Sequence, residues 1–133
     1  MRILLADDQA KVRSALRLLL EHEPELEILG EAVDATGLLD WLKVADPDVL
    51  LLDWELPGLS AAKLVQQMRS HRPGLQVIAL SGLPEARQPA LAAGMHAFVS
   101  KGDPPEVLIG TIHACCRHEA TIHERGGGHD QRQ

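Results

Sequence analysis

Aromatic residues and positive charge are both scarce in this sequence. The chain has no tyrosine, and its only aromatic side chains are Trp41, Trp54 and Phe98. This argues against an RNA-binding sheet, in which bases stack on exposed aromatic rings. There are 13 lysine and arginine residues against 19 aspartate and glutamate residues, so the formal net charge is -6. A chain with this balance is not expected to bind nucleic acid through phosphate contacts.

Long apolar segments and a cysteine framework are also missing. The sequence has no run of about 18 apolar residues, so no membrane-spanning segment is expected. Its acidic start lacks the pattern of a signal peptide. The only two cysteines, Cys115 and Cys116, are adjacent in a segment expected to be helical. Neighbouring side chains on a helix point about 100° apart, so we expect no disulfide between them and predict a reduced, cytoplasmic protein.

Short apolar runs alternate with longer amphipathic segments along most of the chain. The runs with the length of strands are 3–6, 26–32, 49–52, 76–80 and 97–100. The segments expected to be helical are 11–22, the stretch from the cap residue Asp34 to Asp46, 60–71, 90–93, and a last one that opens at Pro104. This alternation predicts an α/β domain with a five-stranded parallel sheet covered by helices on both faces.

Two features refine this prediction. The run 49–52 is apolar at every position, which is typical of a strand buried on both faces in the middle of a parallel sheet. After about residue 118 the chain becomes polar and glycine-rich. We therefore expect residues 1–118 to form one domain and residues 119–133 to form a disordered polar tail. On the last helix we expect Val107, Leu108, Ile112 and Cys115 to face inward.

Polar side chains stand where four of the expected strands end. Asp7 and Asp8 follow the first strand, Asp53 the third, Ser81 the fourth and Lys101 the fifth. In a parallel sheet these ends share one edge, so the side chains should converge. Each pair of carboxylates about 4 Å apart would cost roughly 4 kcal/mol at an effective dielectric near 20. Such a cluster needs counter-charge, which Lys101 and a hard cation such as Mg²⁺ can supply.

The same residue types suit phosphoryl transfer. A carboxylate can attack phosphorus to form an acyl phosphate, and the transfer needs neutralisation of the equatorial oxygens. Asp53 is the best candidate for the nucleophile because it ends the most apolar strand. Asp7 and Asp8 are better placed as metal ligands. Taken alone, however, these two residues could simply cap the following helix.

Four motifs together resemble the receiver domain of two-component response regulators. They are Ala6-Asp7-Asp8, Asp53 with Pro57 four residues later, Leu80-Ser81-Gly82, and Phe98 three residues before Lys101. The resemblance covers about residues 1–118. The spacing from the serine motif to the lysine, and the segment 101–105, look most like receivers of NarL/FixJ-type regulators.

This resemblance implies a fold and a metal site. The fold is the doubly wound, flavodoxin-like (CheY-like) sheet of strand order 2-1-3-4-5 with five helices. The cofactor is Mg²⁺, bound by Asp8 and Asp53 with the backbone carbonyl of Glu55, while Asp7 looks like a ligand through water.

The resemblance also implies a switch. Asp53 looks like the residue that accepts a phosphoryl group from a sensor histidine kinase. Lys101 looks like the lysine that pairs with the phosphate, Ser81 like the switch hydroxyl, and Phe98 like the aromatic residue whose rotamer follows it. Phosphorylation would shift the surface formed by the fourth helix, fifth strand and fifth helix, with homodimerisation as a possible result. The only catalysis expected is self-phosphorylation and self-dephosphorylation, so the chain is not expected to be an enzyme otherwise.

The sequence departs from this family in several places, among them Gly102, which follows Lys101 where chemotaxis-type receivers commonly have proline. Ser60-Ala61-Ala62 stands where receivers often have a glycine-containing stretch, Ala97 replaces the usual glycine before the switch aromatic, and Pro89 would delay the fourth helix. In addition, NarL/FixJ-type regulators carry a DNA-binding domain after the receiver, and this chain ends before one could fit. We therefore expect no direct nucleic-acid binding by this chain, which either acts alone or is a fragment of a longer regulator of transcription.

Two other functions are compatible with part of this residue pattern. Phosphatases of the haloacid-dehalogenase type have a second aspartate two residues after the nucleophile, where this chain has Glu55. A pseudo-receiver that acts as a scaffold for protein interactions, independent of phosphorylation, stays open as the alternative. The histidines near the C-terminus, among them His113, His118 and His123, have no recognisable zinc-binding spacing. No transition-metal site is therefore expected.

Overall fold

The structure, a computed structural model, describes residues 1–115 and contains a five-stranded parallel sheet of order β2-β1-β3-β4-β5. The strands are β1 Arg2–Ala6, β2 Glu27–Ala32, β3 Val49–Asp53, β4 Gln76–Ser81 and β5 Ala97–Ser100. The helices are α1 Ala10–Leu20, α2 Ala35–Val44, α3 Ala61–His71, a 3-10 turn η1 Pro84–Ala86, α4 Arg87–Ala92, and a last helix whose described part is 105–115. This confirms the predicted fold class, strand order and set of five α-helices.

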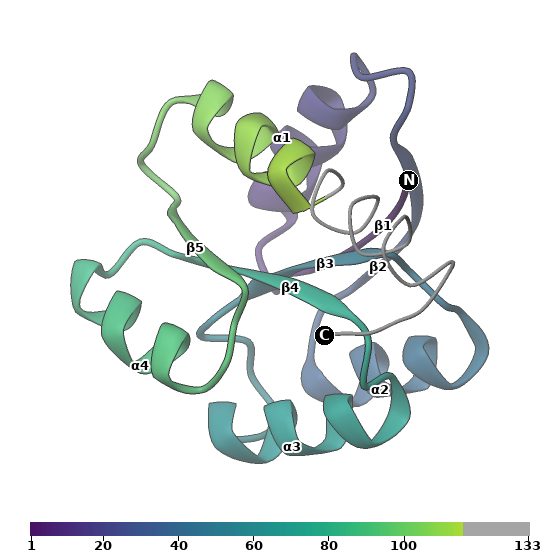
Figure 1. Ribbon diagram of the computed structural model, residues 1–133, viewed down its shortest axis with the longest axis vertical. Coiled ribbons are helices and arrows are strands. Elements are labelled where there is room, and N and C mark those ends of the chain that lie inside the picture. Colours follow the sequence, from purple (N-terminus) through teal and green to yellow (C-terminus); the bar gives the residue numbers. More distant parts are fainter. Residues whose placement is uncertain (116–133) are drawn as a thin grey trace, which may run out of the picture.

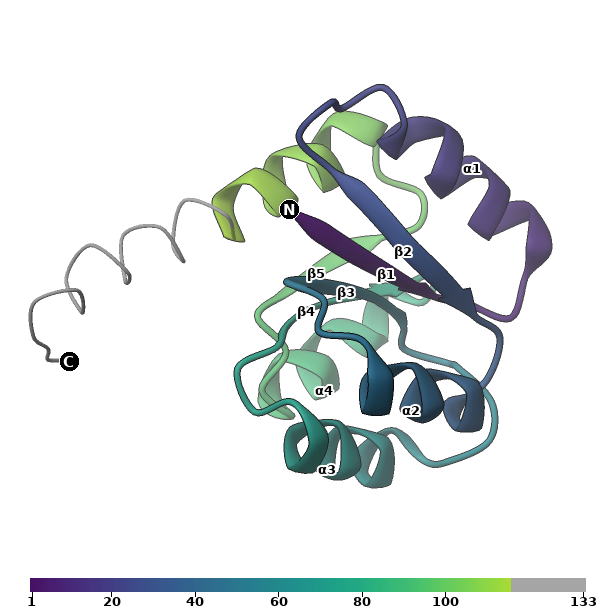
Figure 2. The same ribbon diagram turned by 90° about the vertical axis from the view of Figure 1, so that its right-hand side faces the viewer.

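The helices cover both faces of the sheet (Figures 1 and 2). The first and last helices, α1 and the helix at 105–115, lie on one face, whereas α2, α3 and α4 lie on the other. Each face has its own apolar core. Leu42, Leu64 and Met68 belong to the core under α2 and α3, and Leu20 and Ile112 to the core under α1 and the last helix. The sheet is therefore buried between two helical layers, as the alternating pattern predicted.

Strand β3 is the centre of this arrangement. It pairs with β1 on one side and with β4 on the other, and every one of its residues is buried. The continuous apolar run 49–52 thus has the position that its pattern indicated. The strand ends at Asp53, so an ionisable side chain lies at the carboxyl end of a buried strand.

Two polar residues begin helices as their positions suggested. Asp34 caps α2, because its side chain accepts a 2.8 Å hydrogen bond from the backbone N–H of Gly37. Ser60 caps α3 by accepting a 3.3 Å hydrogen bond from the N–H of Lys63. The unusual sequence at the start of α3 therefore still provides a capped helix.

The fourth helix and one core residue differ from the sequence prediction. Helix α4 begins at Arg87, earlier than predicted, and Pro89 lies inside its first turn. A proline is tolerated there because the first N–H groups of a helix have no partner in any case. Val107 is exposed on the last helix, whereas Leu108, Ile112 and Cys115 are buried. These three positions, spaced by four and three residues, form one stripe that excludes the neighbouring valine.

The prediction for the C-terminal residues of the chain cannot be compared with the structure. The predicted polar tail at 119–133, and the last three residues of the predicted domain, lie outside the described residues. Within residues 1–115, no helix combines the length and apolar character needed to cross a membrane.

Candidate functional site

The carboxyl ends of β1, β3, β4 and β5 bring their polar residues to one edge of the sheet. Backbone hydrogen bonds fix this edge. The N–H of Lys101 donates to the carbonyl of Ser81 at 2.9 Å, and the N–H of Trp54 donates to the carbonyl of Leu80 at 2.8 Å. On the other side of the sheet, the N–H of Asp7 donates to the end of β2 at 3.0 Å. The strand ends are therefore held in register just where the charged side chains begin.

Three aspartates meet at this edge. One carboxylate oxygen from each of Asp7, Asp8 and Asp53 lies within 4.8 Å of the other two. The side chains of Asp7 and Asp53 are only 1% and 3% exposed, whereas Asp8 is exposed. Asp7 also accepts a 2.8 Å hydrogen bond from the N–H of Gln9, next to the start of α1. Asp7 thus supports the first helix and belongs to the acidic cluster as well.

Lys101 supplies the positive charge of the cluster. Its ammonium nitrogen lies 2.8 Å from Oδ2 of Asp7 and 3.5 Å from Oδ1 of Asp53. Burial lowers the pKa of Lys101, but the nearby carboxylates of Asp7 and Asp53 outweigh burial and hold the pKa above its ordinary value. The lysine is therefore charged at neutral pH. One ammonium group faces three carboxylates, so the cluster keeps an excess of negative charge.

Asp53 is in an unfavourable position for a carboxylate. Burial raises its pKa, a 3.0 Å hydrogen bond from the N–H of Glu55 lowers it in part, and the charge of Asp7 raises it again, so that the pKa lies above its ordinary value. The native structure thus resists ionisation of Asp53. A cation at this edge would relieve the cost, because it would neutralise the acidic charge that Lys101 leaves uncompensated.

The side chain of Glu55 is a part of the site that the sequence analysis missed. The hydroxyl of Ser81 lies 2.9 Å and 3.0 Å from the two carboxylate oxygens of Glu55 and donates to this carboxylate. The Ser81 oxygen in turn accepts a 3.0 Å hydrogen bond from the N–H of Leu83. Only the backbone carbonyl of Glu55 was predicted to take part. The available signal was an acidic residue two positions after Asp53, in the loop beside the end of β4.

Phe98, the predicted switch aromatic, lies in β5 and packs against the core under α2, α3 and α4. It is only partly buried, and the guanidinium of Arg87 lies 5.7 Å from the centre of its ring. The register pairs Ser81 with Ser100, so Phe98 lies two residues further back along the neighbouring strand. The structure therefore places Phe98 near the site but outside the acidic cluster, in contact with α4.

An open cleft of about 390 Å³ lies over the acidic cluster. Its lining residues are Asp8, Gln9, Asp53, Glu55, Gly82, Leu83 and Lys101. Carboxylate oxygens in a cleft with room for water are the ligands that Mg²⁺ prefers. The residues present therefore fit a magnesium ion, and Asp53 and Lys101 both line the cleft, which is large enough to admit a phosphoryl group.

The strain on Asp53 predicts that its neutral isostere stabilises the protein when no metal is available. In excess chelator at neutral pH, Asp53→Asn should raise the free energy of unfolding by on the order of 1 kcal/mol, because a buried charge is removed. The free energy of unfolding of the wild-type chain should fall as the pH rises from the ordinary value of 3.8 through the raised pKa of Asp53, because the folded state holds the proton on Asp53 more tightly than the unfolded chain does. Urea unfolding measures both effects. The exposed Asp40→Asn serves as the control, and an Asp53→Asn variant that is less stable than wild type would contradict the expectation.

Comparisons with known proteins indicate the family of this chain. The family model for the response regulator receiver domain matches residues 3–113. The nitrate/nitrite response regulator protein NarP of Escherichia coli (strain K12) is 30% identical over 127 residues, which cover 93% of this chain and 59% of NarP. A protein-glutamate methylesterase/protein-glutamine glutaminase of Rhizobium johnstonii is 33% identical over 110 residues, which cover 80% of this chain and 31% of that protein.

A solved structure shows the same fold. The isolated REC domain of RcsB from Salmonella enterica serovar Typhimurium, in the presence of the phosphomimetic BeF3-, is 27% identical and superposes with a TM-score of 0.81 over 88% of each chain. The chain spans only 53% to 59% of the length of the first curated relatives it matches. Because the family model covers most of its length, this chain belongs to the receiver domain family of two-component response regulators.

Proposed function

We propose that this chain is a phosphorylation switch in which Asp53 accepts a phosphoryl group from a phosphohistidine of a sensor histidine kinase. The observation that carries the proposal is the position of Asp53. It ends the buried central strand, lies 3.5 Å from the Lys101 ammonium, and forms one wall of a cleft open to solvent. A nucleophile, a fixed positive charge and access for a donor are thus combined at one point.

The chemistry follows from these contacts. An oxygen of Asp53 attacks phosphorus and forms an O–P bond while the bond from phosphorus to the donor nitrogen breaks, and the electron pair of that bond stays on the donor imidazole. Lys101 is held 2.8 Å from Asp7 and 3.5 Å from Asp53, so its ammonium is already close to the position that a phosphoryl group on Asp53 would occupy. Attack by water on the same phosphorus would later regenerate Asp53. We propose no enzymatic activity beyond this self-phosphorylation and self-dephosphorylation.

We further propose Mg²⁺ as the cofactor, with Asp8, Asp53 and the backbone carbonyl of Glu55 as ligands and Asp7 as a ligand through water. The support is the cluster of three carboxylates, in which one oxygen of each lies within 4.8 Å of the others. Lys101 alone does not balance the negative charge of this cluster. When bound, the ion would neutralise charge on the phosphoryl oxygens during transfer.

Ser81 and Phe98 are proposed to change conformation when Asp53 is phosphorylated. In the present state the Ser81 hydroxyl donates to Glu55, so it must leave that carboxylate to donate to a phosphoryl oxygen. Such a movement would vacate space at the end of β4 and let Phe98 change rotamer. Phe98 contacts Arg87 of α4, so its rotation would alter the surface formed by α4, β5 and the last helix. A shift between two such states needs only a few kcal/mol of differential stabilisation.

Partners and output are proposed on the same basis. An apolar groove of about 340 Å³ between α1 and the last helix adjoins Lys101 and offers a surface that could hold the kinase beside Asp53. The proposed result of phosphorylation is homodimerisation or control of an output partner, including regulation of transcription through a separate DNA-binding domain. We propose that residues 1–118 form this receiver and that it acts in the cytoplasm. A scaffold independent of phosphorylation is the alternative that the first test addresses.

Intact mass measurement tests the proposal. Purified protein incubated with Mg²⁺ and a small acyl phosphate should gain the mass of one phosphoryl group. The gain should disappear in chelator and in Asp53→Asn, and it should persist in Asp40→Asn, which changes an exposed aspartate on α2. If the small donor fails, a sensor kinase replaces it in the same assay. Labelling that survives in Asp53→Asn, or no labelling from either donor, would favour the scaffold over the switch.

The Glu55 contact predicts a faster reaction when this carboxylate is removed. Glu55→Ala frees the Ser81 hydroxyl and takes one negative charge from the mouth of the cleft. The initial rate of phosphorylation should therefore rise by roughly fivefold, as expected if about 1 kcal/mol of hydrogen bonding no longer has to be broken. A time course by intact mass measures the rate. Glu106→Ala, on the exposed side of the last helix, is the control, and an unchanged or slower rate in Glu55→Ala would refute the role of this contact.

A further inference from the structure

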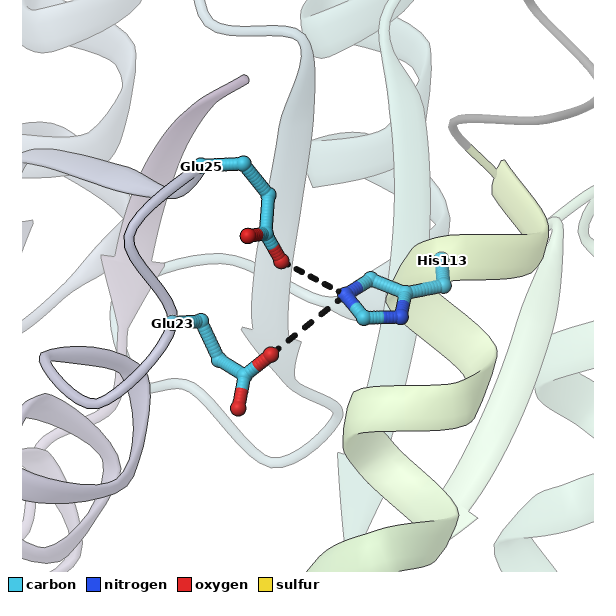
Figure 3. A group of neighbouring side chains, drawn as sticks. All are labelled: Glu23, Glu25 and His113. Atoms are coloured by element: carbon cyan, nitrogen blue, oxygen red, sulfur yellow. Dashed lines mark hydrogen bonds and ion pairs between the residues drawn. The ribbon is translucent and has the colours of Figure 1, made fainter.

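A second group of ionisable side chains lies at the opposite edge of the sheet from Asp53. Glu23 and Glu25 lie in the segment between α1 and β2, and His113 lies in the last helix (Figure 3). The two glutamates precede the amino end of β2, whereas Asp53 is at the carboxyl end of β3. We call these three residues the Glu–His cluster.

The three side chains of the Glu–His cluster point toward one another. Nε2 of His113 lies 2.9 Å from Oε1 of Glu25 and 3.5 Å from Oε1 of Glu23, and all three atoms lie within 4.8 Å of one another (Figure 3). The side chains of Glu23, Glu25 and His113 are 26%, 53% and 37% exposed, so an ion can reach them from solvent. Side chains from two parts of the chain that are 88 residues apart therefore share one small, accessible space.

A hydrogen bond accounts for only one of the two contacts of His113, the one with Glu25. A ring nitrogen carries at most one hydrogen, so Nε2 can donate well to one carboxylate and leaves the other as a close negative neighbour. The distances are close to those between the ligands of one metal ion. Zinc bonds of about 2.0–2.2 Å to nitrogen and oxygen place tetrahedral ligand atoms roughly 3.3–3.6 Å apart. Of the two observed nitrogen–oxygen distances, 3.5 Å lies within this range, and 2.9 Å is shorter by a few tenths of an ångström.

We propose that Glu23, Glu25 and His113 bind a divalent transition-metal ion of the zinc class. The imidazole selects this class, since Mg²⁺ and Ca²⁺ prefer all-oxygen sites, whereas imidazole nitrogen suits zinc and its neighbours. Three protein ligands leave a position for water, so the site is open. The proposal departs from the expectation that there is no transition-metal site, because only the docking of the helix at 105–115 brings the glutamates and the histidine together.

The position of the Glu–His cluster defines what the ion would do. It would join the segment that leads into β2 to the helix at 105–115, which packs on the same face of the sheet as α1. Bound metal would therefore hold the last helix in place. Because the cluster is separate from Asp53, metal binding here is independent of phosphoryl transfer, and the two proposals can fail separately.

Zinc titration of the full chain tests the proposal. After treatment with chelator and transfer to a buffer with saturating Mg²⁺, which occupies the aspartate cluster, the protein is titrated with Zn²⁺ against a chromophoric chelator. Wild type should bind Zn²⁺ and show a higher melting temperature with it. Glu23→Gln, Glu25→Gln and His113→Gln should each weaken binding by at least about tenfold and lose the thermal shift. The glutamine variants keep every other histidine and both cysteines, so any binding elsewhere stays unchanged.

Two controls separate this site from other ligands. His71→Gln removes an exposed histidine on α3 and should leave the affinity unchanged. The Co²⁺ complex should lack a thiolate-to-cobalt charge-transfer band, because the site has only nitrogen and oxygen ligands. The proposal is overturned if Zn²⁺ does not bind, if any one of the three glutamine variants keeps wild-type affinity, or if a thiolate band accompanies binding.

Discussion

The parallel pairing of five strands is the constraint on which the rest of this structure depends. Parallel strands end at the same edge, and here those ends carry Asp7, Asp53, Ser81 and Lys101. The buried strand β3 cannot move its last residue away from its neighbours without breaking its pairing with β1 and β4. The carboxylates are therefore brought together, and the fold itself creates an excess of negative charge that a cation can compensate.

The aspartate cluster and the Glu–His cluster differ in burial and in the types of ligand atom that they contain. At the carboxyl edge, Lys101 pairs with Asp7 and Asp53, and the pKa of Asp53 is still raised by burial and by its neighbours. At the amino edge, Glu23 and Glu25 face the single ring nitrogen of His113. The first cluster is largely buried with oxygen ligands, and the second is more exposed and includes nitrogen. The two should therefore select different ions, Mg²⁺ and zinc respectively.

The features that the sequence predicted correctly depend on residues that are close together along the chain. The apolar run 49–52 identified the central strand because complete burial leaves no polar position. The polar residues at four strand ends predicted the cluster of charged side chains, because parallel topology brings such ends together. The helix cap at Asp34 could also be read directly.

Other features depended on packing between distant segments. The start of α4 was misplaced because proline is harmless in a first turn, which its mere presence does not reveal. The contact of Ser81 with the Glu55 side chain depends on how the loop after β3 folds over the end of β4. The Glu–His cluster joins residues 88 positions apart, so no local pattern could indicate it. Contacts of this kind follow from the tertiary structure rather than from spacing.

The aspartates at the ends of β1 and β3 are proposed to share one Mg²⁺ ion, with Asp53 as a ligand. The most direct measurement is a Mg²⁺ titration followed by the fluorescence of Trp54, which is next to Asp53, in a Trp41→Phe background. We expect a saturable change that fits a single site, with an affinity that falls at least about tenfold when Asp53→Asn is added. A fluorescence change of the same affinity in the Asp53→Asn protein, or no saturable change at all, would contradict it.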